Sequence, residues 1–67
     1  MAGKSSVGKR IRTFREERNV DLETLSQNTG LTVNFLERME NDEIYPTIGP
    51  LQKVARSLGV RLGTFLD

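Results

Sequence analysis

Three polar residues recur at helical spacing in the middle of the chain: Asn34, Arg38 and Asn41. At 100° per residue they share one face of a helix. An Asn amide can form two hydrogen bonds with the edge of adenine, and an Arg guanidinium can do so with guanine. Thr32 and Val33 precede this face and would add methyl groups and free backbone N–H groups to it. The pattern favours recognition of DNA bases, although most outward positions of a helix are simply solvated.

Basic residues near the N-terminus could contact the phosphate backbone of the same DNA. Lys4, Lys9, Arg10 and Arg12 follow one another closely. Each phosphate contact would add about 0.9 to the steepness with which affinity falls as salt rises. For any one of them, a solvated position on the basic face of a surface helix is the alternative interpretation.

Asn41 and Tyr45 lie at the end of the polar face and are the other candidates for phosphate contacts. Tyr45 precedes Pro46, and its ring could instead cover the edge of the core, so both interpretations stay open.

The stretch that contains the candidate base-reading face is acidic. Residues 32–47 contain one Arg and four acids, a balance of −3, whereas residues 1–18 contain six Lys or Arg and two Glu, a balance of +4. The positive charge therefore lies on the first helix and not on the candidate base-reading face.

One ion pair is expected inside the domain. Glu40 lies one helical turn after Leu36 and borders the apolar face of its helix, where a carboxylate needs a cation. Arg15 flanks the apolar side of the first helix in the same way, next to Phe14. We therefore expect Arg15 and Glu40 to join the first helix to the third in a structural role.

The composition excludes several classes of function. The chain has 67 residues with neither His nor Cys, and it has no Gly-rich loop after a strand and no calcium-loop pattern in its acidic run. No enzymatic activity, metal or cofactor is expected. Such a length encloses one small core. The lack of Cys indicates a reducing compartment, hence the cytoplasm, and the lack of an apolar run argues against a signal peptide or membrane span.

An all-α fold is expected because helix formers abound and apolar residues recur at helical spacing. Residues 1–6 are predicted to be a flexible N-terminal arm and residues 7–67 one domain. Its helices are predicted over residues 7–18, 22–28, 33–41, 48–58 and 62–66. The expected N-caps are Asp21, Thr32 and Thr47, and the expected helix-ending residues are Asn19, Gly30 and Gly59. Two short helices joined by a turn with Gly30 form a helix-turn-helix.

The chain resembles the Cro/cI-type, or XRE, family of bacterial and phage transcriptional regulators. The residues that carry the resemblance span the chain from Val7 onward: Gly8-Lys-Arg-Ile-Arg12, Phe14-Arg15, Leu25-Ser26, Thr29-Gly-Leu-Thr32, Phe35-Leu-Glu-Arg-Met-Glu40, Pro46-Thr47 and Ala55-Arg-Ser-Leu-Gly-Val60. The resemblance implies a compact five-helix, lambda-repressor-like domain with the helix-turn-helix in helices 2 and 3. It also implies a homodimer on double-stranded DNA, with half-sites about 34 Å apart. The family's base-reading positions fall on Thr32, Val33, Asn34 and Arg38, and its ion pair falls on Arg15 and Glu40.

The chain departs from the family pattern at several candidate contact positions. Leu22 stands where many members have a Gln that contacts phosphate, and Val33 replaces a frequent polar base reader. Asp42 and Glu43 stand where Gly and a basic residue are common. These departures predict fewer contacts with the DNA backbone and a lower affinity for a lone domain.

The last helix is the candidate dimer surface. Leu62, Phe65 and Leu66 exceed what one short helix can bury alone, so some of them are expected to pack across a two-fold axis. Residues 35–40 and 62–66 also resemble regulators in which this domain precedes a C-terminal cupin-type sensor. A missing C-terminal sensor domain is therefore a further expectation.

Two functions are compatible with this sequence. The first is a sequence-specific transcriptional regulator that reads an operator through the helix from about Val33 to Asn41. The alternative is a protein–protein interaction module that keeps the helix-turn-helix fold without operator binding, since a fold does not fix a function. The acidic stretch from Glu37 to Glu43 favours the alternative.

Overall fold

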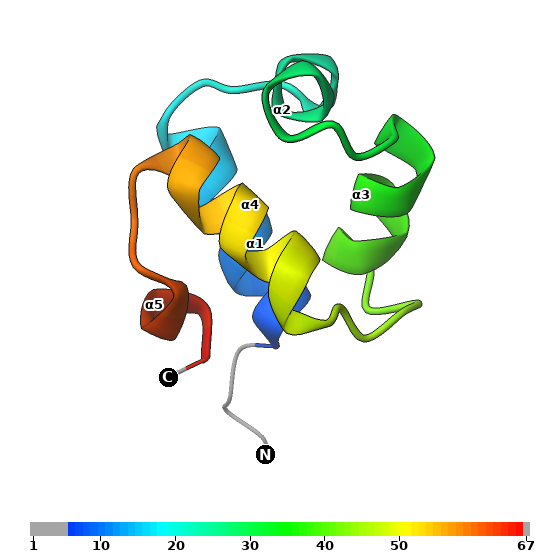
Figure 1. Cartoon of the computed structure of the whole chain (residues 1–67), viewed down its shortest axis with the longest axis vertical. Coiled ribbons are helices and arrows are strands. Elements are labelled where there is room, and N and C mark those ends of the chain that lie inside the picture. The colour runs from blue at the N-terminus through cyan, green and yellow to red at the C-terminus, as the bar shows by residue number, and fades with distance from the viewer. Residues whose placement is uncertain (1–5, 67) are drawn as a thin grey trace.

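Five helices make up the part of the chain that the structure, a computed structural model, describes, residues 6–66. They are α1 (Val7–Glu17), α2 (Leu22–Thr29), α3 (Val33–Glu40), α4 (Ile48–Leu58) and α5 (Leu62–Leu66). α1 and α4 pass through the middle of the domain, with α2 and α3 on one side and α5 on the other (Figure 1). The predicted all-α class with five helices is confirmed. Lys4 and most of the predicted arm lie outside the described residues.

The helix starts follow capping chemistry, with two corrections. The side chains of Asp21 and Thr32 each accept the backbone N–H three residues further on, at 2.8 and 3.1 Å, as predicted. Ser6 was expected to belong to the arm, but its hydroxyl accepts the N–H of Lys9 at 3.0 Å and caps α1. Thr47 occupies the N-cap position of α4, but its side chain forms no capping hydrogen bond within the described chain. Ser6 therefore caps α1, and Thr47 stands at the N-cap of α4 without the expected side-chain hydrogen bond.

The helix ends require a left-handed backbone, which most residues avoid. Asn19, Gly30 and Gly59 have φ of 56°, 80° and 73°, in agreement with their predicted roles. Asp42 has φ of 62° after α3 and was not predicted to turn the chain in this way. Among the described residues, no helix is both long enough and apolar enough to span a membrane.

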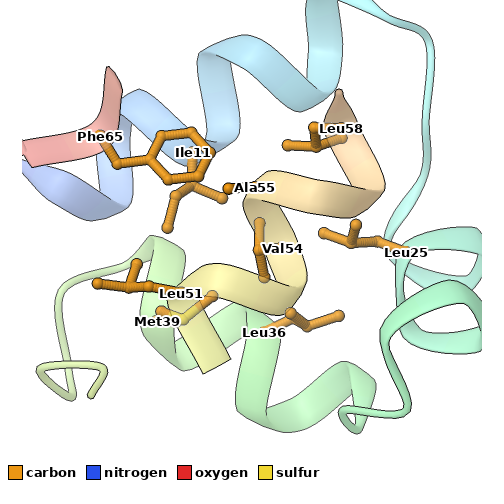
Figure 2. Close-up of a cluster of buried hydrophobic side chains, with 9 residues drawn as sticks. All are labelled: Ile11, Leu25, Leu36, Met39, Leu51, Val54, Ala55, Leu58 and Phe65. Atoms are coloured by element: carbon orange, nitrogen blue, oxygen red, sulfur yellow. The ribbon is translucent and has the colours of Figure 1, made fainter. Parts of the chain in front are cut away.

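The core lies between α4 and the other helices. Four of its side chains come from α4, which is why this helix is central in Figure 1. Each fully buried aliphatic or aromatic side chain stabilises the fold by about 1.5–3 kcal/mol. The nine buried apolar residues, all labelled in Figure 2, are Ile11, Leu25, Leu36, Met39, Leu51, Val54, Ala55, Leu58 and Phe65.

The prediction that Phe65 contributes to a dimer surface is wrong. Its side chain is 1% exposed, and Figure 2 shows it reaching from α5 toward Ile11. Its ring meets the ring of Phe14 edge to face, with centroids 5.9 Å apart. Leu62 is half-buried against the same core, whereas Leu66 is 49% exposed. The single short helix therefore buries more of its apolar side chains within its own chain than expected.

The start of α1 packs directly on the end of α3. Gly8 is buried there, and a Cβ added to it would overlap the carbonyl oxygen of Met39. The same Cβ would lie 2.7 Å from the carbonyl oxygen of Glu40, closer than real Cβ atoms come. The backbones of α1 and α3 thus approach too closely to leave room for a side chain at residue 8.

Candidate nucleic-acid interface

α3 has one buried face and one exposed face. Leu36 and Met39 are completely buried, and Glu40 is 6% exposed. Asn34 and Arg38 are exposed on the opposite side. The remaining candidates on α3 and its flanks are also accessible: Thr32 and Asn41 are exposed, and Val33 is half-buried. The core therefore fixes the side of α3 that stays open to a partner.

The turn before α3 has the geometry of a helix-turn-helix. Gly30 has φ of 80° and its N–H donates to the carbonyl of Ser26 at 2.8 Å, which closes α2. The hydroxyl of Thr29 accepts the N–H of Leu31 at 3.2 Å, and Thr32 then caps α3. Only Leu31 and Thr32 separate this turn from α3. The short connection holds α3 against the rest of the domain at a defined angle.

Arg15 and Glu40 form the ion pair expected from the sequence. Nε and Nη2 of Arg15 donate to the two carboxylate oxygens of Glu40 at 2.6 and 2.9 Å, and both residues are buried. Nη1 of Arg15 donates to the carbonyl of Val20 at 2.8 Å. The hydrogen bond to Glu40 and the negative charge of its carboxylate raise the pKa of Arg15, so the guanidinium stays charged despite its burial. The pair ties the inner face of α3 to α1.

Arg38 forms an ion pair that the sequence analysis missed. Its Nε lies 3.5 Å from Oε1 of Glu43, and about half of each side chain is exposed. The left-handed backbone of Asp42 brings Glu43 back toward α3. A signal was available in the sequence, because Asp tolerates this conformation better than most residues. The candidate base reader therefore has a carboxylate partner on the outer surface.

The basic residues of α1 divide between two sides of the helix. Arg12 is near α3, because its Nε lies 3.9 Å from Oε1 of Glu40 and 3.7 Å from Oε2 of Glu16. Lys9, one turn earlier, is exposed. Arg10 is 200° from Arg12 on a helical wheel, and its Nη1 donates to the carbonyl of Thr64 in α5 at 3.5 Å. Because α5 lies across the domain from α3 (Figure 1), the guanidinium of Arg10 lies away from α3 and from the side on which phosphate contacts were expected.

Tyr45 does not cover the core, because 85% of its surface is exposed. Pro46 beside it is buried instead. The ring forms one wall of an apolar groove of about 460 Å³ that runs below the start of α4 to Leu66. The interpretation of Tyr45 as a cover for the core edge is therefore wrong, while its hydroxyl remains free to reach a partner. The residues that line the groove are Tyr45, Pro46, Thr47, Ile48, Leu51 and Leu66.

Comparison with known proteins extends these observations. SinR, an HTH-type transcriptional regulator of Bacillus subtilis, is 34% identical over 62 residues, which cover 91% of this chain and 56% of SinR. The immunity repressor of Bacillus phage phi105 is 30% identical over 61 residues, which cover 91% of this chain and 42% of that repressor. The crystal structure of SinR in complex with DNA superposes with a TM-score of 0.86 at 32% identity, covering 91% of this chain and 98% of that one. The lambda-repressor-like arrangement of the five helices is thereby confirmed.

The chain spans less than two thirds of the length of both of these curated relatives. The family description that matches it is the Cro/C1-type HTH DNA-binding domain, over residues 10–67. The match includes the turn at Gly30, all of α3 and the Arg15–Glu40 pair. The resemblance deduced from the sequence is confirmed, and this chain belongs to the family of Cro/C1-type helix-turn-helix DNA-binding domains.

Proposed function

We propose that this chain is the operator-reading domain of a sequence-specific transcriptional regulator, with α3 in the major groove of double-stranded DNA. The observation that carries the proposal is the exposed polar face of α3, which directly follows the helix-turn-helix turn and is held from behind by the core and by the Arg15–Glu40 pair. The SinR structure with DNA supports it, because its fold matches over almost the whole chain. In a groove about 12 Å wide, an α-helix fits with its side chains against base edges.

The proposed contacts follow from exposure and residue type. Asn34 and Arg38 read base edges through paired hydrogen bonds, while Thr32 and Val33 approach from the helix start. The phosphate contacts that we retain are those of Lys9, Arg12, Asn41 and Tyr45, all of which are exposed. Arg10 is left out because its guanidinium faces α5.

A selection of bound duplexes from a random DNA pool, followed by fluorescence anisotropy over a range of salt, tests the proposal. We expect enrichment of a two-fold site, with affinity that falls steeply as salt rises and a clear preference over scrambled DNA.

Arg38→Ala should relax the preference at one base pair by roughly 5- to 150-fold, the range of one bidentate contact. Arg10→Ala is the matched control and should leave both preference and affinity unchanged. No enrichment by a folded sample, even when artificially dimerised, would contradict operator binding.

We further propose that the domain acts as a homodimer whose contact surface is the apolar groove. Tyr45, Ile48 and Leu66 are 85, 55 and 49% exposed, and these three exposed large apolar side chains of the described chain all line this groove. The groove starts at the link after α3, so pairing of two copies through it would hold two α3 helices in a fixed relation. Ile48→Ser should lower self-association measured by sedimentation, whereas a wild-type monomer at millimolar concentration would contradict the dimer for this chain.

A C-terminal sensor domain and a cytoplasmic location stay predictions.

The second candidate function is a protein-interaction module without operator binding. The observation that favours it is the cluster of exposed acids on and after α3, formed by Glu37, Asp42 and Glu43, which would repel phosphates. A basic protein partner would be retained by this surface, and the binding would be lost in Glu37→Lys. If the DNA selection fails while such a partner is found, this function replaces the first.

A further inference from the structure

The side chain of Glu43 is held beside Arg38 by the backbone as well as by charge. After α3, the N–H of Asp42 donates to the carbonyl of Met39 at 3.2 Å, and the N–H of Glu43 donates to the carbonyl of Arg38 at 2.9 Å. This pair of bonds around a left-handed residue is the Schellman arrangement. Glu43 is thus bonded through its backbone to the same residue that its carboxylate approaches at 3.5 Å.

The contact uses one edge of the guanidinium and leaves the other free. The carboxylate of Glu43 approaches Nε of Arg38. Within residues 6–66, the Arg38 side chain forms no other ion pair or hydrogen bond. A guanine presents O6 and N7 as two neighbouring acceptors in the major groove, and a guanidinium satisfies both with two parallel N–H groups. The terminal nitrogens of Arg38 are therefore available for guanine while its inner nitrogen is engaged by Glu43.

We propose that Glu43 is a positioning residue that sets the base preference of Arg38 for guanine. The inference deepens the proposed operator-reading function and rests on it. A free Arg side chain loses rotamer entropy when it is fixed against a base. Glu43 restricts the side chain before DNA arrives, so less of that entropy is lost when the two hydrogen bonds to the base form.

The same carboxylate has an opposite effect on binding that does not depend on sequence. It adds a negative charge near the phosphates and lowers the affinity for every duplex. Glu43 thus raises the discrimination between bases at the expense of general affinity. A residue that acted only through its charge would change the affinity for all sequences by one factor and leave the discrimination constant.

The test compares Glu43→Gln with Asp42→Asn in the full chain. Both variants remove one negative charge at adjacent exposed positions, and Asn tolerates the left-handed backbone of residue 42. Only the first removes the charged partner of Arg38. On the selected operator and on duplexes with each guanine replaced in turn, Glu43→Gln should lower the preference at one base pair about tenfold while raising the affinity for scrambled DNA. Asp42→Asn should raise the affinity for all duplexes alike.

A measurement without DNA provides the second readout. In the free protein, the Nε–H of Arg38 should exchange with water several times faster in Glu43→Gln than in the wild type or in Asp42→Asn, as followed by NMR of the guanidinium. Equal discrimination and equal exchange in the two variants would overturn the inference.

Arg38→Ala separates the possible failures. If Arg38→Ala abolishes the preference at a guanine and Glu43→Gln does not reduce it, the positioning role of Glu43 is wrong while the proposed operator reading stands. If Arg38→Ala changes the preference at no base pair, the proposed role of Arg38 fails, and the inference about Glu43 fails with it.

Discussion

Arg15 shows how a buried side chain can determine the position of α3, the candidate recognition helix, without itself contacting a ligand. Its guanidinium satisfies both oxygens of Glu40 and the carbonyl of Val20. Buried charges are tolerated only when their hydrogen bonds are satisfied in this way. The face of α3 opposite to this pair is the one that carries the candidate base readers.

Glu40→Gln should lower the free energy of unfolding by about 3 kcal/mol, because it leaves the buried guanidinium of Arg15 without a counter-charge. Urea unfolding followed by circular dichroism measures the change. In a double-mutant cycle, the double variant with Arg15→Met and Glu40→Leu should lose less free energy of unfolding than the sum of the losses in Arg15→Met alone and Glu40→Leu alone. Glu16→Gln, which breaks the exposed pair with Arg12, is the control and should cost at most about 1 kcal/mol. Additive losses in the cycle would contradict coupling between Arg15 and Glu40.

Asp21 predicts a pH dependence of stability. The hydrogen bonds from the backbone N–H and the hydroxyl of Thr24 lower the pKa of the Asp21 carboxyl below its ordinary value of 3.8. A lowered pKa in the folded state means that the ionised form stabilises the fold. Relative to Asp21→Asn, which keeps a neutral cap, the wild type should therefore be more stable above pH 3.8 and lose this advantage as the pH falls through the lower folded value. A difference in free energy of unfolding that stays constant from pH 7 to pH 2 would contradict this assignment.

At the scale of residues, the sequence predicts contacts that follow from helical periodicity. Arg15 and Glu40 could be paired because each borders an apolar stripe. The partner of Arg38 could not be found in this way, because Glu43 lies beyond the helix and returns only through the left-handed turn at Asp42. Side-chain contacts that depend on a single unusual backbone angle are invisible to periodicity.

Among the elements, the contact between α1 and α3 depends on the absence of a side chain at Gly8. Gly8→Ala should lower the free energy of unfolding by about 1–3 kcal/mol, because the new methyl group would meet the backbone oxygens of Met39 and Glu40, which cannot move as a flexible side chain would. Gly49→Ala in α4 is the matched control. Its Cβ would meet nothing within 4 Å, and Ala favours a helix over Gly by about 0.5–1 kcal/mol, so this variant should be slightly more stable. Equal thermal melting of the two variants would contradict the close approach.

The helices themselves could be predicted, since their apolar spacing and most of their caps are local properties. Asp21 and Thr32 are both local caps. The errors are those of three-dimensional context. α4 begins without a hydroxyl bond from Thr47, and Phe65 finds room in the core beside Phe14 that no count of apolar residues in α5 could foresee.

For the molecule as a whole, the distribution of charge predicts how binding responds to salt. Lys9 is exposed one turn before Arg12 on α1, and Arg12 lies near Glu40 of α3, whereas Arg10 points to α5. Replacing Lys9 or Arg12 with Gln should each reduce the slope of log affinity against log salt by about 0.9, because one phosphate contact is lost. Arg10→Gln removes the same charge and should leave the slope unchanged. Equal slopes for all three variants would mean that α1 does not lie along the DNA backbone.

The net charge of +1 does not by itself indicate the salt dependence that we predict for DNA binding. The fold class follows from composition and periodicity, and the family from spaced positions along the whole chain. The division of the basic residues of α1, with Arg12 near α3 and Arg10 near α5, could not be predicted, because it depends on how α1 packs against both helices.

The three bonds of Arg15 also bear on how the domain opens. They connect α1, the link after it at Val20, and α3 through one rigid planar group. Detaching α3 alone would therefore strand a charge in the core, so these segments should open together or not at all. In amide hydrogen exchange, the last turn of α1 and the whole of α3 should therefore share one free energy of opening, well above that of α5. The candidate recognition helix α3 would then be among the last parts of the molecule to open.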